Sequence, residues 1–377
     1  MKKWIMALLA AGMLFPNGQA DAETGQVHFY LNNEKQLLQQ APYVLDGRVY
    51  VPLREIGNKL DARTVWDGEN KTVYMWSPDS SLEWTLGSEN MMVNGQSIKT
   101  DAAPMIRNQS IYVPIRFISD AFGAPISWDS SSYAVTLNQE PNRYYSTELS
   151  KAKIWLDPAL QKLYISEGKN PTAVIEQLQM DSTEWLSMEA AVIDDTSYLI
   201  TIQSVTGEPH LHTYQYRYLV SEGELRHHTQ IDYYGFKSTV NRSVFDGKAV
   251  MLDSTTLEIV NTSGNVEHSY PLQEYTGMEG PFIVEQVYED YLLVRPYRLD
   301  ALVLIDLENK RATTLYEALL SEEEQSYLEE RYSDGEGIMF DYPGDQIRFV
   351  KREGDTFHFT YKGLFDNKEY NVEYEVQ

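Results

Sequence analysis

The pattern of apolar and polar positions differs between the two halves of the chain, and it predicts two kinds of structure. In the first half, apolar residues spaced i, i+3 and i+7 (Leu53, Ile56 and Leu60) indicate a short amphipathic helix between short strands. Beyond residue 152, short β-runs alternate with turn residues, a pattern typical of an all-β region. The polar stretch 139–152 lies between them and is expected to be a linker.

The first half is a duplication. Residues 27–76 align with 89–138 without a gap, an offset of 62 positions. The two copies share a motif whose residues are Tyr50, Pro52, Arg54, Trp66 and Asp67 in the first and Tyr112, Pro114, Arg116, Trp128 and Asp129 in the second. Each copy is expected to form hairpins, a strand, one helix with proline at its first position, and a returning strand pair. Neither copy has enough apolar surface alone, so the two should share one core in a pseudo-symmetric α+β domain over 27–138.

The repeated motif is interpreted as structural. Arg54 and Arg116 are expected to hold carbonyl groups or an aspartate at the repeat interface. Trp66 and Trp128 are expected to fill the core. The alternatives are a ligand-binding arginine–aspartate pair and a platform of tryptophans on which a sugar stacks.

The second half, 153–377, is interpreted as a β-propeller of about five blades, with a β-sandwich as the alternative. Five turns separate strand pairs, and they stand at 167–168, 222–223, 263–264, 308–309 and 366–367. Their spacing fits four-stranded blades of about 40–50 residues. One helix interrupts this pattern, because Ser321 and Glu324 form a capping box.

Composition and charge restrict the location and the partners. The formal net charge of −25 makes nucleic-acid binding improbable, since it repels phosphate backbones. Residues 1–22 have a basic start, a short apolar run and a small-residue cleavage pattern, which predicts a signal peptide cut after Ala22. No later stretch is apolar enough to span a membrane, and there is no cysteine for a lipid anchor or a disulfide. The mature chain is therefore expected to be secreted or wall-associated, in a bacterium.

Candidate chemistry is sparse. His210 and His212 could form half of a metal site, but the 227–228 histidines would lie too far along the ladder. The carboxylates of Asp194 and Asp195 are interpreted as turn residues. Nucleophile-elbow, zinc-protease and phosphate-loop motifs are missing from the sequence. We predict no catalytic residue, no metal site and no cofactor.

The duplicated Tyr-Val-Pro-[Leu/Ile]-Arg motif with its downstream Trp-Asp resembles the stalk domain, also called the copper amine oxidase N-terminal-like domain, of Gram-positive bacteria. The resemblance covers roughly 27–138 and implies a non-catalytic α+β module at the cell envelope. It does not imply oxidase activity, because the Asn-Tyr dipeptide from which the oxidase forms its quinone cofactor is missing from the sequence.

The functional hypothesis is a secreted, non-catalytic envelope protein. Its stalk domain would dock or act as a spacer, and its propeller-like region would bind a glycan, a peptide or a protein. The expected partner is a cell-wall polymer or an envelope protein. The alternatives are an extracellular carbohydrate-active enzyme, with two or three carboxylates converging at the propeller funnel, and a sensory ectodomain.

Overall fold

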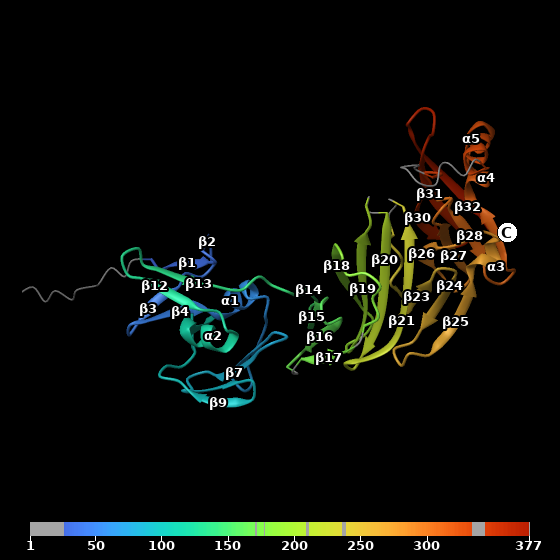
Figure 1. The fold of residues 1–377 in the computed structure, drawn as a ribbon. Coiled ribbons are helices and arrows are strands. Elements are labelled where there is room, and N and C mark those ends of the chain that lie inside the picture. The colour runs from blue at the N-terminus through green and yellow to red at the C-terminus, as the bar shows by residue number, and fades with distance from the viewer. Residues whose placement is uncertain are drawn as a thin grey trace, which may run out of the picture.

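The computed structural model describes residues 26–169, 172–176, 178–208, 211–235, 239–333 and 344–376. An N-terminal domain built from both repeats is followed by a series of antiparallel sheets (Figure 1). The predicted signal peptide, 1–22, lies outside the described residues. Within the described ranges, no helix is both long enough and apolar enough to span a bilayer.

The N-terminal domain contains three sheets and two helices. The sheets have the strand orders β12-β13-β1-β2, β10-β11-β4-β3 and β5-β6-β7-β8-β9. The helices are α1 (Leu53–Lys59) and α2 (Ile115–Phe122). The strands are β1 (His28–Leu31), β2 (Glu34–Gln36), β3 (Tyr43–Leu45), β4 (Arg48–Pro52), β5 (Arg63–Asp67), β6 (Thr72–Trp76), β7 (Ser81–Thr85), β8 (Asn90–Val93), β9 (Gln96–Lys99), β10 (Met105–Arg107), β11 (Ser110–Pro114), β12 (Ile126–Asp129) and β13 (Ala134–Leu137).

The two copies of the motif pair with each other. Strand β4 runs antiparallel to β11, with Val51 opposite Val113 and Tyr50 opposite Pro114. Every sheet of the domain mixes strands from both copies. The core is accordingly shared, because apolar side chains of both helices enter one buried cluster with residues of all three sheets. The predicted α+β domain with a common core is confirmed.

The strand that follows the aligned repeat belongs to different domains in the two copies. In the first copy, β7 follows β6 and pairs with it inside the domain. Adding the offset of 62 to 81–85 gives 143–147, which overlaps β14 (Tyr145–Glu148). Strand β14 pairs with β15 of the next region instead of returning to its own domain. The predicted linker 139–152 therefore contains a strand, and the two regions are joined by continuous structure.

In its described residues, the second region has five antiparallel sheets in chain order, four of four strands and one of three. The first has β14, β15 (Ala152–Asp157), β16 (Lys162–Glu167) and β17 (Ala173–Ile175). The second has β18 (Leu186–Val192), β19 (Ser197–Thr206), β20 (His212–Ser221) and β21 (Glu224–Tyr234). The third has β22 (Val244–Phe245), β23 (Lys248–Asp253), β24 (Thr256–Val260) and β25 (Val266–Pro271). The fourth has β26 (Phe282–Val287), β27 (Tyr291–Pro296), β28 (Val303–Asp306) and β29 (Arg311–Thr314), and the fifth has β30 (Arg348–Glu353), β31 (Thr356–Lys362) and β32 (Glu369–Glu375).

The five predicted turns each join the last two strands of one sheet, so the turn pattern located all five sheets. This confirms a propeller-like all-β region of blade-like units. The capping box is present at the start of α5 (Glu322–Ser333): the Glu324 backbone N–H donates to the Ser321 hydroxyl over 3.4 Å, and the Glu324 carboxylate accepts the Ser321 backbone N–H over 3.3 Å. Two short helices were not predicted, α3 (Leu272–Thr276) and α4 (Leu315–Leu319), which follow the last strands of the third and fourth sheets.

Neighbouring sheets pack through apolar clusters, each of which joins a sheet to the next one in the chain. Buried arginines add a second kind of contact. Arg217 of β20 donates to the carbonyls of Asn241 (3.1 Å) and Arg242 (2.7 Å), just before the third sheet starts. Arg295 of β27 donates to the Ile347 carbonyl, just before the fifth sheet starts. A guanidinium with five donors can hold several carbonyls of an irregular segment at once.

Candidate functional site

The motif tyrosines form an aromatic cluster on the paired strands β4 and β11. Tyr50 and Tyr112 are buried, with 4% and 2% of their surface exposed. Tyr43 lies between them, stacked on Tyr50 with ring centroids 5.5 Å apart and tilted against Tyr112 at 5.1 Å. Burial raises the pKa of all three phenols. These tyrosines therefore pack together where the two repeats pair.

The prolines and arginines stand at the starts of the two helices. Pro52 and Pro114 end β4 and β11, one residue before the helices begin. The prediction that they occupy the first helical position is therefore wrong by one residue. Arg116 binds Asp101 with 3.1 Å between Nη2 and Oδ1. Arg54 is exposed and lines a pocket beside α1. The predicted aspartate partner is thus found for the second copy.

The two motif tryptophans are placed differently. Trp66 is half-buried and packs against the shared core. Trp128 was predicted to fill the core, but 43% of its surface is exposed. Its strand, β12, is an edge strand, so only one side of the strand is covered by a neighbour. The ring of Tyr133 meets its indole edge-on at 5.8 Å. The prediction that Trp128 lies in the core is therefore wrong.

The motif aspartates close turns. Asp67 accepts the Asn70 side-chain amide over 2.9 Å and pairs with Lys169 at 2.7 Å. Asp129 accepts the Ser132 hydroxyl over 2.6 Å and the Ser131 backbone N–H over 2.9 Å. The hydrogen bond from Lys169 lowers the pKa of Asp67 to about 2, and those from the two serines lower the pKa of Asp129 to about 2. Both aspartates are held ionised, which suits a turn cap and not a proton donor.

A pocket of about 370 Å³ opens beside Trp128. Its floor is apolar, made by the start of α2 and by β13, and its rim carries charges. Arg48 and Arg116 reach the same carboxylate, with Arg48 Nη2 lying 3.0 Å from Asp101 Oδ2. The hydrogen bond from Arg48 lowers the pKa of Asp101. An exposed indole beside guanidinium groups can bind a flat or ring-shaped ligand that carries polar groups.

The N-terminal domain is fixed to the first sheet through Asp61. This residue follows α1 with φ of +54°, a left-handed conformation that few residues other than glycine adopt. Its carboxylate pairs with the buried Lys153 at 2.6 Å and accepts the Ser146 hydroxyl over 2.8 Å. Its backbone carbonyl accepts the Trp155 indole N–H over 2.9 Å. Arg63, the first residue of β5, donates to the Lys151 carbonyl over 2.5 Å.

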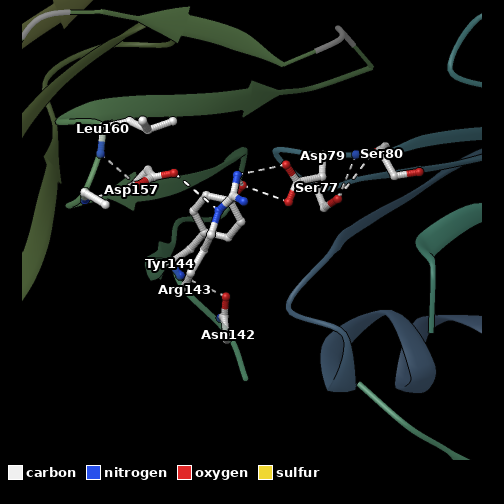
Figure 2. Close-up of polar contacts among 9 residues, drawn as sticks. Ser77, Asp79, Ser80, Asn142, Arg143, Tyr144, Asp157 and Leu160 are labelled. Carbon is white, nitrogen blue, oxygen red and sulfur yellow. Dashed lines mark hydrogen bonds and ion pairs between the residues drawn. The ribbon is translucent and has the colours of Figure 1, made fainter. Parts of the chain in front are cut away.

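A second set of contacts crosses the same junction. Figure 2 shows Arg143 between Asp79 of the N-terminal domain and Asp157 of the first sheet, at 3.1 Å and 3.3 Å. The Tyr144 hydroxyl donates to Asp79 over 2.8 Å, and the Arg143 guanidinium lies 4.7 Å from the centre of the Tyr144 ring. Asp157 is 1% exposed and also accepts two backbone N–H groups. Side chains of both regions therefore hold 142–146 from two sides.

The other sequence candidates are found in ordinary surface contacts. His212 pairs with Asp232 at 2.9 Å, and His227 pairs with Glu258 at 3.0 Å. His210 lies outside the described residues. Asp195 pairs with Lys151 at 2.5 Å, and Asp194 accepts the Thr196 backbone N–H, as a turn residue does. Across the ranges that the structure describes, no group of three or more metal-ligating side chains converges.

Sequence reasoning missed Asp61, Lys153 and the Arg48–Asp101 pair. One signal could have located Asp61: the residue at the same place in the second copy is Gly123, which has φ of +63°. Glycine is expected after a helix in the left-handed conformation, so an aspartate there suggests a compensating contact. The Arg48–Asp101 pair joins residues 53 positions apart, and no local pattern reports such a distance.

Comparison with known proteins identifies the first domain. A family model described as the copper amine oxidase N-terminal domain matches residues 30–137. No curated protein matches the chain. One similar solved structure is the Neurospora crassa Pan2 WD40 domain, with 9% identity, coverage of 84% of this chain and 80% of that chain, and a TM-score of 0.22. Residues 30–137 of this chain therefore form a copper amine oxidase N-terminal domain, the family that the repeated motif indicated.

Proposed function

We propose that this chain is a secreted, non-catalytic protein of the cell envelope. Its N-terminal domain docks on an envelope glycan, and its propeller-like region is held at a fixed position to bind a glycan, a peptide or a protein. The observation that carries the proposal is the open pocket beside Trp128, where a large aromatic side chain is exposed next to charged groups. Sugar rings bind well on such exposed aromatic faces, because the C–H side of the ring is apolar.

The arrangement of the domain supports a docking and spacing role. Strand β12, which carries Trp128, lies on the side of the N-terminal domain away from β14–β17 (Figure 1). The junction on the other side is fixed by Asp61, Lys153 and Arg143. A ligand bound at the pocket would therefore hold the second region at a defined distance. Export rests on the sequence of residues 1–22.

The carbohydrate-active enzyme is the second candidate, and no observation on the described residues favours it. A glycosidase needs a carboxylic acid that stays protonated near neutral pH, so its pKa must be raised. In the second region, the carboxyl groups whose pKa departs from the ordinary value have it lowered, which is the opposite direction. A hydrogen bond from Arg352 lowers the pKa of Asp290, and one from Lys351 lowers that of Glu353.

The test is a sedimentation assay of the mature chain, residues 23–377, with purified bacterial cell walls. We expect the wild-type protein to sediment with the walls and Trp128→Ala to lose at least about tenfold in apparent affinity. Trp185→Ala is the matched control, since this tryptophan is 73% exposed but belongs to the second region. Failure of the wild type to sediment, or equal sedimentation of Trp128→Ala, would refute docking through this pocket.

A further inference from the structure

The pocket beside Trp128 has a counterpart in the other repeat. A pocket of about 300 Å³ lies beside Trp66, and its lining follows from the first pocket by the offset of 62 residues. Pro114, Ile115 and Arg116 correspond to Pro52, Leu53 and Arg54, and Val135 corresponds to Val73. One wall of each pocket comes from a hairpin of the opposite copy, because the repeats are intertwined. The two pockets are therefore built on one plan.

Apart from the shared arginine, the charged positions differ between the two pockets. Arg48 at the rim of the Trp128 pocket corresponds to Ser110 at the other pocket. Phe117 in the Trp128 pocket corresponds to Glu55. The Glu55 carboxylate accepts the backbone N–H groups of residues 39 and 40, at 2.6 and 3.0 Å. The Trp66 pocket thus carries one guanidinium and one carboxylate among these positions.

The Trp128 pocket carries an excess of positive charge. Arg48 and Arg116 share the single carboxylate of Asp101, so two cations face one anion among the lining residues. Their side chains are 34% and 60% exposed, and each keeps donors that Asp101 does not use. The surrounding chain has a formal net charge of −25. The cationic rim attracts an anion to this pocket, whereas the acidic surface of the rest of the chain repels it.

We propose that the Trp128 pocket binds a carboxylate-bearing sugar of an acidic polysaccharide, with its ring on the Trp128 indole and its carboxylate on Arg116 and Arg48. This deepens the docking role proposed above and rests on it. Arginine suits this ligand, because its planar fork matches a carboxylate with two parallel hydrogen bonds. The apolar floor around Ile115 and Phe117 accommodates the uncharged side of the ring. No bond is made or broken, so the site only binds.

The probes are uronic acid oligosaccharides and their uncharged forms. Galacturonate and glucuronate oligomers are titrated into the mature chain and followed by tryptophan fluorescence, in parallel with their methyl esters. The esters keep the ring and lose the charge. We expect the acids to bind at least about tenfold more tightly than the esters, since a charge-assisted pair contributes roughly that much. We also expect affinity for the acids to fall as salt is raised.

The matched variants come from the two copies of the repeat. Arg116→Gln should weaken binding of the acids about tenfold and leave binding of the esters unchanged. Arg54→Gln, the same change at the counterpart position, should leave both unchanged. Circular dichroism and thermal unfolding establish that each variant is folded, and because Arg116 is an exposed side chain, its loss should alter stability little.

Three results would overturn the proposal: acids and esters that bind equally or not at all, Arg54→Gln weakening the acids as much as Arg116→Gln, or binding of a phosphate-linked wall polymer alone. The sedimentation assay separates this failure from failure of the docking role. Wall binding that depends on Trp128 but shows no preference for uronates would leave docking intact and refute the acidic sugar. Absence of wall binding would refute the docking role itself.

Discussion

The junction through Asp61 leads to a sharp prediction, because the second repeat supplies the substitution that tests it. Asp61 holds a left-handed backbone conformation, and the corresponding residue of the other copy is Gly123. The change Asp61→Gly therefore keeps the backbone geometry and removes only the carboxylate. The lost contacts are the pair with Lys153 at 2.6 Å and the hydrogen bonds from Ser146 and Asn142. The indole bond from the first sheet to the residue 61 carbonyl can remain.

The magnitude follows from two opposing effects. Lys153 has a side chain that is 6% exposed, and its next carboxylate, Glu148, is 3.9 Å away. Leaving a buried charge without its close partner costs about 3–5 kcal/mol. Glycine relieves the left-handed backbone by about 1–2 kcal/mol. The expected net loss is about 1–4 kcal/mol in the free energy of unfolding, confined to the contact between the two regions.

The assay combines urea unfolding of the mature chain with limited proteolysis of the 139–151 segment. We expect a lower unfolding midpoint and faster cleavage there. Asp46→Gly is the matched control, because Asp46 has φ of +49° at an exposed hairpin tip. That variant should be equally or slightly more stable than the wild type. If Asp61→Gly behaved like Asp46→Gly in both measurements, the carboxylate would not hold the junction, and the reasoning would be refuted.

Two further predictions concern charged groups. Arg295→Met should lower the free energy of unfolding by about 3–5 kcal/mol, measured in urea, because it strands the fully buried Asp345 that pairs with Arg295 at 2.9 Å; an unchanged midpoint would contradict this. For Asp67, whose pKa is lowered to about 2 by the Lys169 hydrogen bond, the stabilisation is complete above pH 4 and disappears as pH falls toward 2. The difference in free energy of unfolding between wild type and Asp67→Asn should therefore disappear between about pH 4 and pH 2. A difference that stays constant over this pH range would show that ionised Asp67 is not what stabilises the wild type.

The sequence predicted those parts of the fold that rest on local or repeated patterns. The turn at Asn94-Gly95 has φ of +50° and +75°, as a two-residue hairpin turn requires. The five turns of the second region each belong to one sheet, because a hairpin is specified by a few neighbouring residues. The gapless repeat predicted the shared core, since neither half-unit has enough apolar surface to form a core alone.

The parts that could not be predicted depend on contacts between distant residues. Arg295 and Asp345 are 50 positions apart, and an arginine in a strand gives no sign of whether it will be buried. Strand β14 lies in a polar stretch whose sequence predicts a linker. It is a strand because it pairs with β15 of the next sheet, and this pairing has no local sequence signal. The Trp128 position was misjudged for a related reason. The motif places a tryptophan on an edge strand in both copies, but the sequence does not say which edge remains open.

Comparison of the two copies suggests where the function of this domain is encoded. Val51 and Val113 are identical in the two copies, and they pair with each other where strand β4 meets β11. Other positions differ between the copies, and two of these differences lie where the domain meets the second region or opens to solvent. Aspartate replaces glycine where the second region is bound at Asp61. Arginine replaces serine at Arg48, where the exposed pocket is charged. The Trp128 pocket therefore combines shared side chains, Trp128 and Arg116, with the unshared Arg48, and it is the unshared residue that distinguishes this pocket from its counterpart beside Trp66.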